Sequence, residues 1–177
     1  MEDLSLHILD VAENSIEAGA TTVEITVEED TENDLLNMEI KDNGRGMDAG
    51  VMKTATDPFF TTKTVRKVGL GLPFLKQAAK ECEGRFSLAS EKGKGTKISV
   101  SFKRSHIDRK PMGDVAATIM VLIAGNPGID FLFTYKKDSY TYRLDTREIR
   151  KELAEIPINS PRVLKLLRDD IDEGLKG

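Results

Sequence analysis

The sequence lacks the features that mark disulfide-stabilised, fibrous and disordered proteins. It contains no tryptophan and one cysteine, Cys82, which cannot form a disulfide within the chain and therefore fits a reducing compartment. No internal repeat or low-complexity tract interrupts it, and its 39% hydrophobic and 32% charged residues are typical of soluble globular proteins. Because 177 residues can bury a core without covalent staples, we expect one compact unit.

The sequence also has no long hydrophobic run and no excess of positive charge. Its longest apolar stretch, residues 115–125, is much shorter than the roughly 20 residues that cross a bilayer. The acidic N-terminus does not resemble a signal peptide, so we expect a cytoplasmic protein without a membrane partner. The net charge of −4 argues against nucleic acid as the main partner. The densest basic cluster, at residues 103–110, is more typical of a solvated linker than of a binding surface.

Hydrophobic periodicity predicts alternating helices and strands in the first hundred residues. Residues 4–18 form an amphipathic helix that ends at Gly19, with His7, Asp10 and Asn14 on its polar side. The remaining elements expected here are strands at residues 23–27, 36–42, 85–90 and 96–102, and a helix from about Gly71 to Gly84 with Pro73 in its first turn.

An aspartate ends the row of buried residues in the second strand. A period of two places Met38 and Ile40 on the same face as Asp42, where a carboxylate is unusual. Gly44 and Gly46 follow at once, so the backbone there must bend sharply or let another group approach closely. One interpretation is a surface turn in which the aspartate bonds its own backbone, and the other is a ligand site.

Four short segments, far apart in the chain, have a common explanation. They read LDVAENSIEAGA, DNGRGM, VGLGL and GKGT, and in order and spacing they resemble the N, G1, G2 and G3 boxes of the GHKL superfamily. This superfamily comprises gyrase, heat-shock chaperone, histidine kinase and mismatch-repair ATPases, and the resemblance covers residues 4–103. It implies an α+β fold of the Bergerat type, a two-layer sandwich in which a mixed, mostly antiparallel sheet carries helices on one face. We expect residues 1–104 to form this ATP-binding domain.

The resemblance assigns roles at the base end of the expected ATP site. Asp42 matches the aspartate that accepts a hydrogen bond from the exocyclic amine of adenine, which needs an acceptor in an apolar slot. Gly44 and Gly46 would let the backbone pass close to the base, and Met47 would form a wall. Thr96 matches the G3-box threonine and would fix the hairpin beneath the nucleotide.

Other matched residues would bind magnesium and activate the reacting group. Asn14 matches the N-box asparagine, and its amide oxygen suits Mg²⁺, which prefers oxygen ligands. Asp10 occupies the position of a glutamate that resembles a general base in the ATPase members. Because an aspartate is one methylene shorter, it argues against hydrolysis. Glu13 is a candidate to assist or replace Asp10, although a surface salt bridge explains it equally well.

The phosphates need backbone donors and positive charge. The G2 box supplies residues that would bind phosphates through N–H groups at a helix start: Gly69, Leu70 and Gly71. Residues 57–68 have little periodicity, so we expect a mobile loop that closes over the nucleotide as a lid. Lys63 and Arg66 in this loop could then reach the triphosphate.

The boxes leave three functions open. ENSIEAGA is similar to the mismatch-repair ATPases, whereas DPFFTTK, GLGL and GKGT are similar to the catalytic domain of histidine kinases. The first hypothesis is a kinase that phosphorylates a histidine or a serine/threonine of a separate protein. The second is an ATP-driven switch or slow ATPase that acts on a partner or on a second copy in a homodimer, and the third is a nucleotide-binding module without turnover. His7 lacks the acidic neighbour of a phosphoacceptor histidine, so we expect a structural role for it.

Residues 105–177 resemble no family that we can name. Their pattern predicts a small α+β extension with a helix at residues 113–124, a hairpin around the KKDS turn and two helices, beginning at Asp145 and Ser160. We expect this extension to pack on the ATP-binding domain through its apolar helix, in preference to docking a partner.

Overall fold

The computed structural model describes residues 3–57 and 68–177, and of residues 68–70 it describes only the backbone. The helices in this part of the chain are α1 (Leu4–Glu17), α2 (Ala49–Thr54), α3 (Val68–Glu81), α4 (Val115–Gly125), α5 (Thr146–Leu153) and α6 (Pro161–Gly174). The strands are β1 (Thr22–Asp30), β2 (Leu35–Asp42), β3 (Arg85–Glu91), β4 (Gly95–Lys103), β5 (Asp130–Lys137) and β6 (Tyr140–Asp145).

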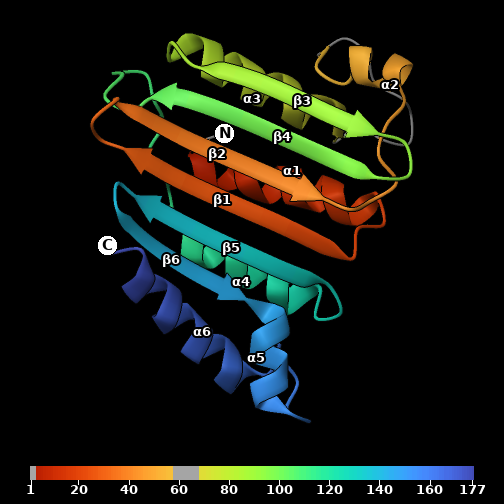
Figure 1. Cartoon of the computed structure of the whole chain (residues 1–177), viewed down its shortest axis with the longest axis vertical. Coiled ribbons are helices and arrows are strands. Elements are labelled where there is room, and N and C mark those ends of the chain that lie inside the picture. Colours follow the sequence, from red (N-terminus) through yellow and green to blue (C-terminus); the bar gives the residue numbers. More distant parts are fainter. Residues whose placement is uncertain (1–2, 58–67) are drawn as a thin grey trace.

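The six strands form one sheet in the order β3-β4-β2-β1-β5-β6. Neighbouring strands are antiparallel except β1 and β5, which are parallel. Helices α1, α3 and α4 lie together behind this sheet in Figure 1, so they share one of its faces. The arrangement confirms the predicted α+β fold, with a mixed, mostly antiparallel sheet and a helical layer.

Alternation within the strands places the core between the sheet and the helices. In β1, Val23, Ile25 and Val27 are buried, and the residues between them are partly exposed. The buried stripe of α1, which includes Ile8 and Val11, packs on β1 and β2. Burial of apolar surface stabilises such a layer by roughly 25 cal/mol per Å² removed from water. The core therefore fixes α1 against the strands that end at the candidate site.

The residues after 105 extend the same sheet. Strand β5 lies parallel to β1, with Phe131 opposite Val23, and β6 pairs with β5 at the edge. Helix α4 connects β4 to β5 and packs against α1, where Thr118 Oγ1 donates a hydrogen bond of 3.3 Å to the Ser5 carbonyl oxygen. The sheet is continuous through both parts of the chain, so their division near residue 104 stays a prediction.

Helix α2 and the start of α3 differ from the sequence-based expectations. Helix α2 has no buried residue, so no hydrophobic periodicity marked it in the sequence. It begins after Asp48, whose side chain accepts a 2.8 Å hydrogen bond from the Val51 amide. Helix α3 begins at Val68 instead of near Gly71, which places Pro73 in its second turn. Packing of α3 against α1 and β4 outweighs the weak helix propensity of the glycines at its start.

The helices described here are all too short or too polar to cross a membrane.

Candidate functional site

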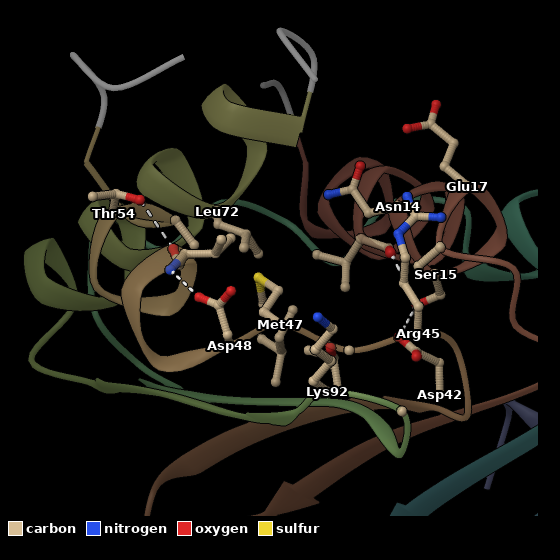
Figure 2. Close-up of a pocket in the computed structure, with 18 residues that line it drawn as sticks. Asn14, Ser15, Glu17, Asp42, Arg45, Met47, Asp48, Thr54, Leu72 and Lys92 are labelled. Atoms are coloured by element: carbon tan, nitrogen blue, oxygen red, sulfur yellow. Dashed lines mark hydrogen bonds between the residues drawn. The ribbon is translucent and has the colours of Figure 1, made fainter. Parts of the chain in front are cut away.

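A cavity of about 500 Å³ opens between α1, the turn after β2, helix α2 and the β3–β4 hairpin (Figure 2). Its apolar wall includes Val11 from α1, Leu72 from α3 and Ile98 from β4. Largely apolar walls around a few polar groups are typical of small-molecule sites. Five of the predicted ATP-binding residues line the cavity: Asn14, Asp42, Gly46, Met47 and Thr96.

Asp42 stands at the end of β2 and is 9% exposed. Its Oδ2 accepts a 2.7 Å hydrogen bond from Ser15 Oγ on α1, and its Oδ1 accepts one of 2.8 Å from the Gly44 amide. The two donors hold the orientation of this carboxylate. The two interpretations of this segment are therefore combined, because Asp42 bonds its own turn and also lines the cavity.

The neighbouring asparagine has a separate structural role. Asn43 Oδ1 accepts hydrogen bonds from the amides of Thr21 and Thr22, at 2.8 and 2.9 Å, and its Nδ2 donates to Thr21 Oγ1. Asn43 thereby ties the turn after β2 to the start of β1 and keeps Asp42 in register.

The glycines of the DNGRGM turn are required by the surrounding backbone. A Cβ at Gly44 would lie 2.9 Å from the Ala18 carbonyl oxygen. Gly46 has a φ of +68°, and a Cβ there would overlap the Glu91 carbonyl oxygen. The turn is thus pressed between the end of α1 and the β3–β4 hairpin. Close approach of protein backbone, in addition to any ligand, explains both glycines.

A serine connects the turn to the hairpin. Ser90 Oγ accepts a 2.8 Å hydrogen bond from the Met47 amide and lies 2.8 Å from Thr96 Oγ1. Thr96 is the register partner of Asp42 across β4 and β2. Met47, Thr96 and Asp42 are therefore positioned by one hydrogen-bonded framework, although no motif in the sequence singled out Ser90.

Two predicted residues lie one turn apart on α1. Asn14 lines the cavity, and among the described residues its buried Nδ2 has no hydrogen-bond partner. An amide end without a partner in a cavity can bind a ligand oxygen or, after rotation, a cation. The Asp10 carboxylate lies directly over Gly71 of α3, where a Cβ would overlap its Oδ2. Glu13 is exposed and is not among the residues that line the cavity.

The expected phosphate end is only partly described. Lys63 and Arg66 lie outside the described residues, as does most of the expected lid. Gly69 and Leu70 belong to the first turn of α3, and Gly71 follows them against Asp10. Their contacts with phosphates stay a prediction.

The donor set fits a magnesium ion that is held mainly by a nucleotide. Among residues 3–57 and 68–177, no group of three or more His, Cys, Asp or Glu side chains could hold a metal. Magnesium typically uses one or two protein oxygens together with phosphates and waters. Asn14 provides such a group inside the cavity.

His7 is a buried residue of α1, the helix that also carries Asn14. It is 3% exposed, and desolvation lowers the pKa of its imidazole to about 4, so the ring is neutral at physiological pH. Its Nδ1 has no hydrogen-bond partner among the described residues. These properties fit the structural role expected from the sequence.

Sequence reasoning missed several residues of the cavity. Ser15 positions Asp42, and Arg45 and Lys92 bring positive charge to the wall. Helical spacing offered one usable signal, because Val11, Ser15 and Ala18 lie at intervals of four and three on the same face of α1.

Comparisons of the sequence with known proteins find similar segments in a putative sensor protein and in a sensor kinase. A putative sensor protein of Shewanella frigidimarina is 35% identical over 109 residues, which make up 60% of this chain and 17% of that protein. Sensor kinase CckA of Brucella abortus is 39% identical over 74 residues, covering 41% of this chain and 8% of the kinase. The chain thus spans less than a fifth of the length of these relatives.

Comparisons of the fold give a different set of proteins. The N-terminal domain of a DNA repair protein matches with a TM-score of 0.54 and 17% identity, over 82% of this chain and 52% of that one. The ADP-complexed MutL ATPase domain of Aquifex aeolicus matches with a TM-score of 0.53 and 16% identity, over 99% of this chain and 70% of that one. At such identities the likeness concerns the fold alone.

The family model described as histidine kinase-, DNA gyrase B- and HSP90-like ATPase matches residues 2–106, which is more than half of the chain. This match confirms the resemblance carried by the four boxes. The chain therefore belongs to the family of histidine kinase-, DNA gyrase B- and HSP90-like ATPases.

Proposed function

We propose that this chain binds Mg-ATP in the cavity and transfers the γ-phosphoryl group to a side chain of a separate protein. The observation that carries the proposal is the buried Asp42 carboxylate, fixed by Ser15 and Gly44 in a largely apolar cavity. An adenine amine is a donor that fits this acceptor, and the apolar walls fit the faces of the base.

The phosphates would extend from the base toward α3. Asn14 lies one turn before Ala18 on α1, and Asp10 lies a further turn away, against the start of α3. The N-terminus of a helix offers unpaired N–H groups and a positive dipole end, which favour phosphate. Asn14 would hold magnesium, which would neutralise charge on the β- and γ-phosphates.

The short side chain of Asp10 and its position favour phosphoryl transfer to a protein over hydrolysis. Its carboxylate packs on Gly71, so a general base at this position is both short and held against a helix. A neutral imidazole can attack the γ-phosphorus without a base, since its ring nitrogen carries a free electron pair. The bond from phosphorus to the bridging oxygen then breaks, and ADP leaves. The sensor kinases among the sequence relatives support this reading.

An ATP-driven switch is the second candidate. The ENSIEAGA segment resembles mismatch-repair ATPases, and the fold likeness to the MutL ATPase domain takes in 99% of this chain, including the strands after residue 105. In such a switch, closure over ATP would change the affinity for a partner protein or a second copy of the chain, and the phosphate would go to water slowly.

Incubation with γ-labelled ATP and magnesium tests the choice. Candidate partners are the proteins encoded next to this one, added singly to the purified chain. A kinase leaves label on a partner, whereas a slow ATPase releases labelled phosphate without it. Transfer should persist in Asp10→Asn, and Asp10→Glu should change hydrolysis little.

The same assay contains its own control. Asn14→Ala should remove either activity, because both need the metal on the triphosphate. Faster phosphate release by Asp10→Glu, with no labelled partner, would favour the switch. Full activity of Asn14→Ala would contradict the assignment of this face of α1 to the phosphate end.

A further inference from the structure

Two positively charged side chains on the cavity wall form no ion pair within the described part of the chain. They are Arg45, in the turn after β2, and Lys92, in the β3–β4 hairpin. Other lysines of the same hairpin region are paired, Lys94 with Glu91 at 2.8 Å and Lys97 with Glu39 at 3.2 Å. Both paired lysines lie outside the cavity lining. Within the β3–β4 hairpin, Lys92 therefore differs from Lys94 and Lys97 in that it lines the cavity and has no ion pair among the described residues.

Backbone hydrogen bonds on both sides hold Arg45 in place. Its amide donates a 2.9 Å hydrogen bond to the Ala18 carbonyl oxygen at the end of α1. Its own carbonyl oxygen accepts one of 2.6 Å from the Gly93 amide of the hairpin. Both neighbours of Arg45 are glycines, so Arg45 carries the only side chain in residues 44–46. The Cα of this long side chain is therefore held in a fixed position by the backbone.

The backbone of Arg45 lies at the end of the cavity where the adenine base is expected. Arg45 is three residues after Asp42, and Ala18, which holds its amide, is three residues after Ser15, which holds the Asp42 carboxylate. Figure 2 shows the Arg45 side chain extending from the turn toward the α1 side of the cavity, where Asn14 and Glu17 are labelled. Glu17 and Ala18 end α1 beside the turn that carries Arg45, whereas Asn14, the proposed magnesium ligand, lies one helical turn closer to Asp10 and the start of α3, where phosphates are expected.

We propose that Arg45 is a nucleotide-binding residue that contacts the adenosine half of the ligand and closes the mouth of the cavity over it. This inference rests on the proposed function. A guanidinium is planar and weakly hydrated, so it can cover an aromatic base or its ribose, which a lysine ammonium does less well. An unpaired arginine at this position is thus a determinant of affinity for the nucleoside, independent of the phosphates.

Calorimetric titration of adenosine, ADP and Mg-ATP tests this role. Arg45→Ala should weaken the binding of all three ligands by a similar factor, about 2- to 5-fold, as expected for a cation over a ring at an exposed site. Arg45→Lys should recover only part of the loss, because it restores charge without the plane. The matched control is Lys94→Ala, which removes an exposed cation of the hairpin outside the cavity and should bind all three as wild type.

Each result separates this inference from the proposed function. Failure of the wild-type chain to bind ATP refutes the function itself. Normal ATP binding by the wild type with unchanged affinities in Arg45→Ala refutes the role of Arg45 alone. A loss that grows from adenosine through ADP to ATP assigns Arg45 to the phosphates and overturns the inference, as does full recovery by Arg45→Lys. Circular dichroism of each variant checks that the chain remains folded.

Discussion

Asp42→Asn is expected to weaken ATP binding while the fold is retained. Asn can still accept the Gly44 amide hydrogen bond at Oδ1, and Ser15 Oγ can turn its proton toward the Val11 carbonyl oxygen, 3.3 Å away. The new NH₂ group would then face Ser15, and the charged acceptor for adenine is lost. Hydrogen bonds to charged groups contribute about 1.5–3 kcal/mol. This corresponds to a rise in Kd of roughly 10- to 150-fold.

Calorimetric titration with Mg-ATP measures this change directly. The matched control is Asp48→Asn, an identical chemical change in the same cavity, at a residue whose side chain caps α2. Because asparagine is an equally good N-cap, this control should keep both stability and ATP affinity. Wild-type affinity in Asp42→Asn would remove this residue from the base site, and an equal loss in Asp48→Asn would show that the cavity responds to charge in general.

Three further predictions concern packing and pH. Gly71→Ala should lower the free energy of unfolding by roughly 1–3 kcal/mol because its Cβ overlaps Asp10, and Asp10→Ala should restore it in denaturant titrations. Gly46→Ala, at φ +68°, should destabilise the chain and weaken ATP binding, whereas Gly50→Ala in α2 should not. The lowered pKa of His7 means that the unfolded chain binds its proton first, so stability should fall from pH 6.5 to about pH 4, and this fall should shrink in His7→Leu.

Local patterns in the sequence determined most of the elements and the base end of the site. Alternation placed Asp42 on the buried face at the end of a strand, and the structure confirms that position. Helical spacing placed Asp10 and Asn14 one turn apart on α1. These features depend on neighbours a few residues away, so a single chain shows them directly.

The tertiary structure decided which distant groups meet. Ser15 and Asp42 are 27 residues apart and Asp10 and Gly71 are 61 apart, so neither pair leaves a periodic signal in the chain. The same holds for the parallel pairing of β5 with β1, which joins residues more than a hundred positions apart. Burial of apolar faces between the sheet and the helices selects these contacts, because this packing covers the apolar stripes of the elements with close-packed side chains.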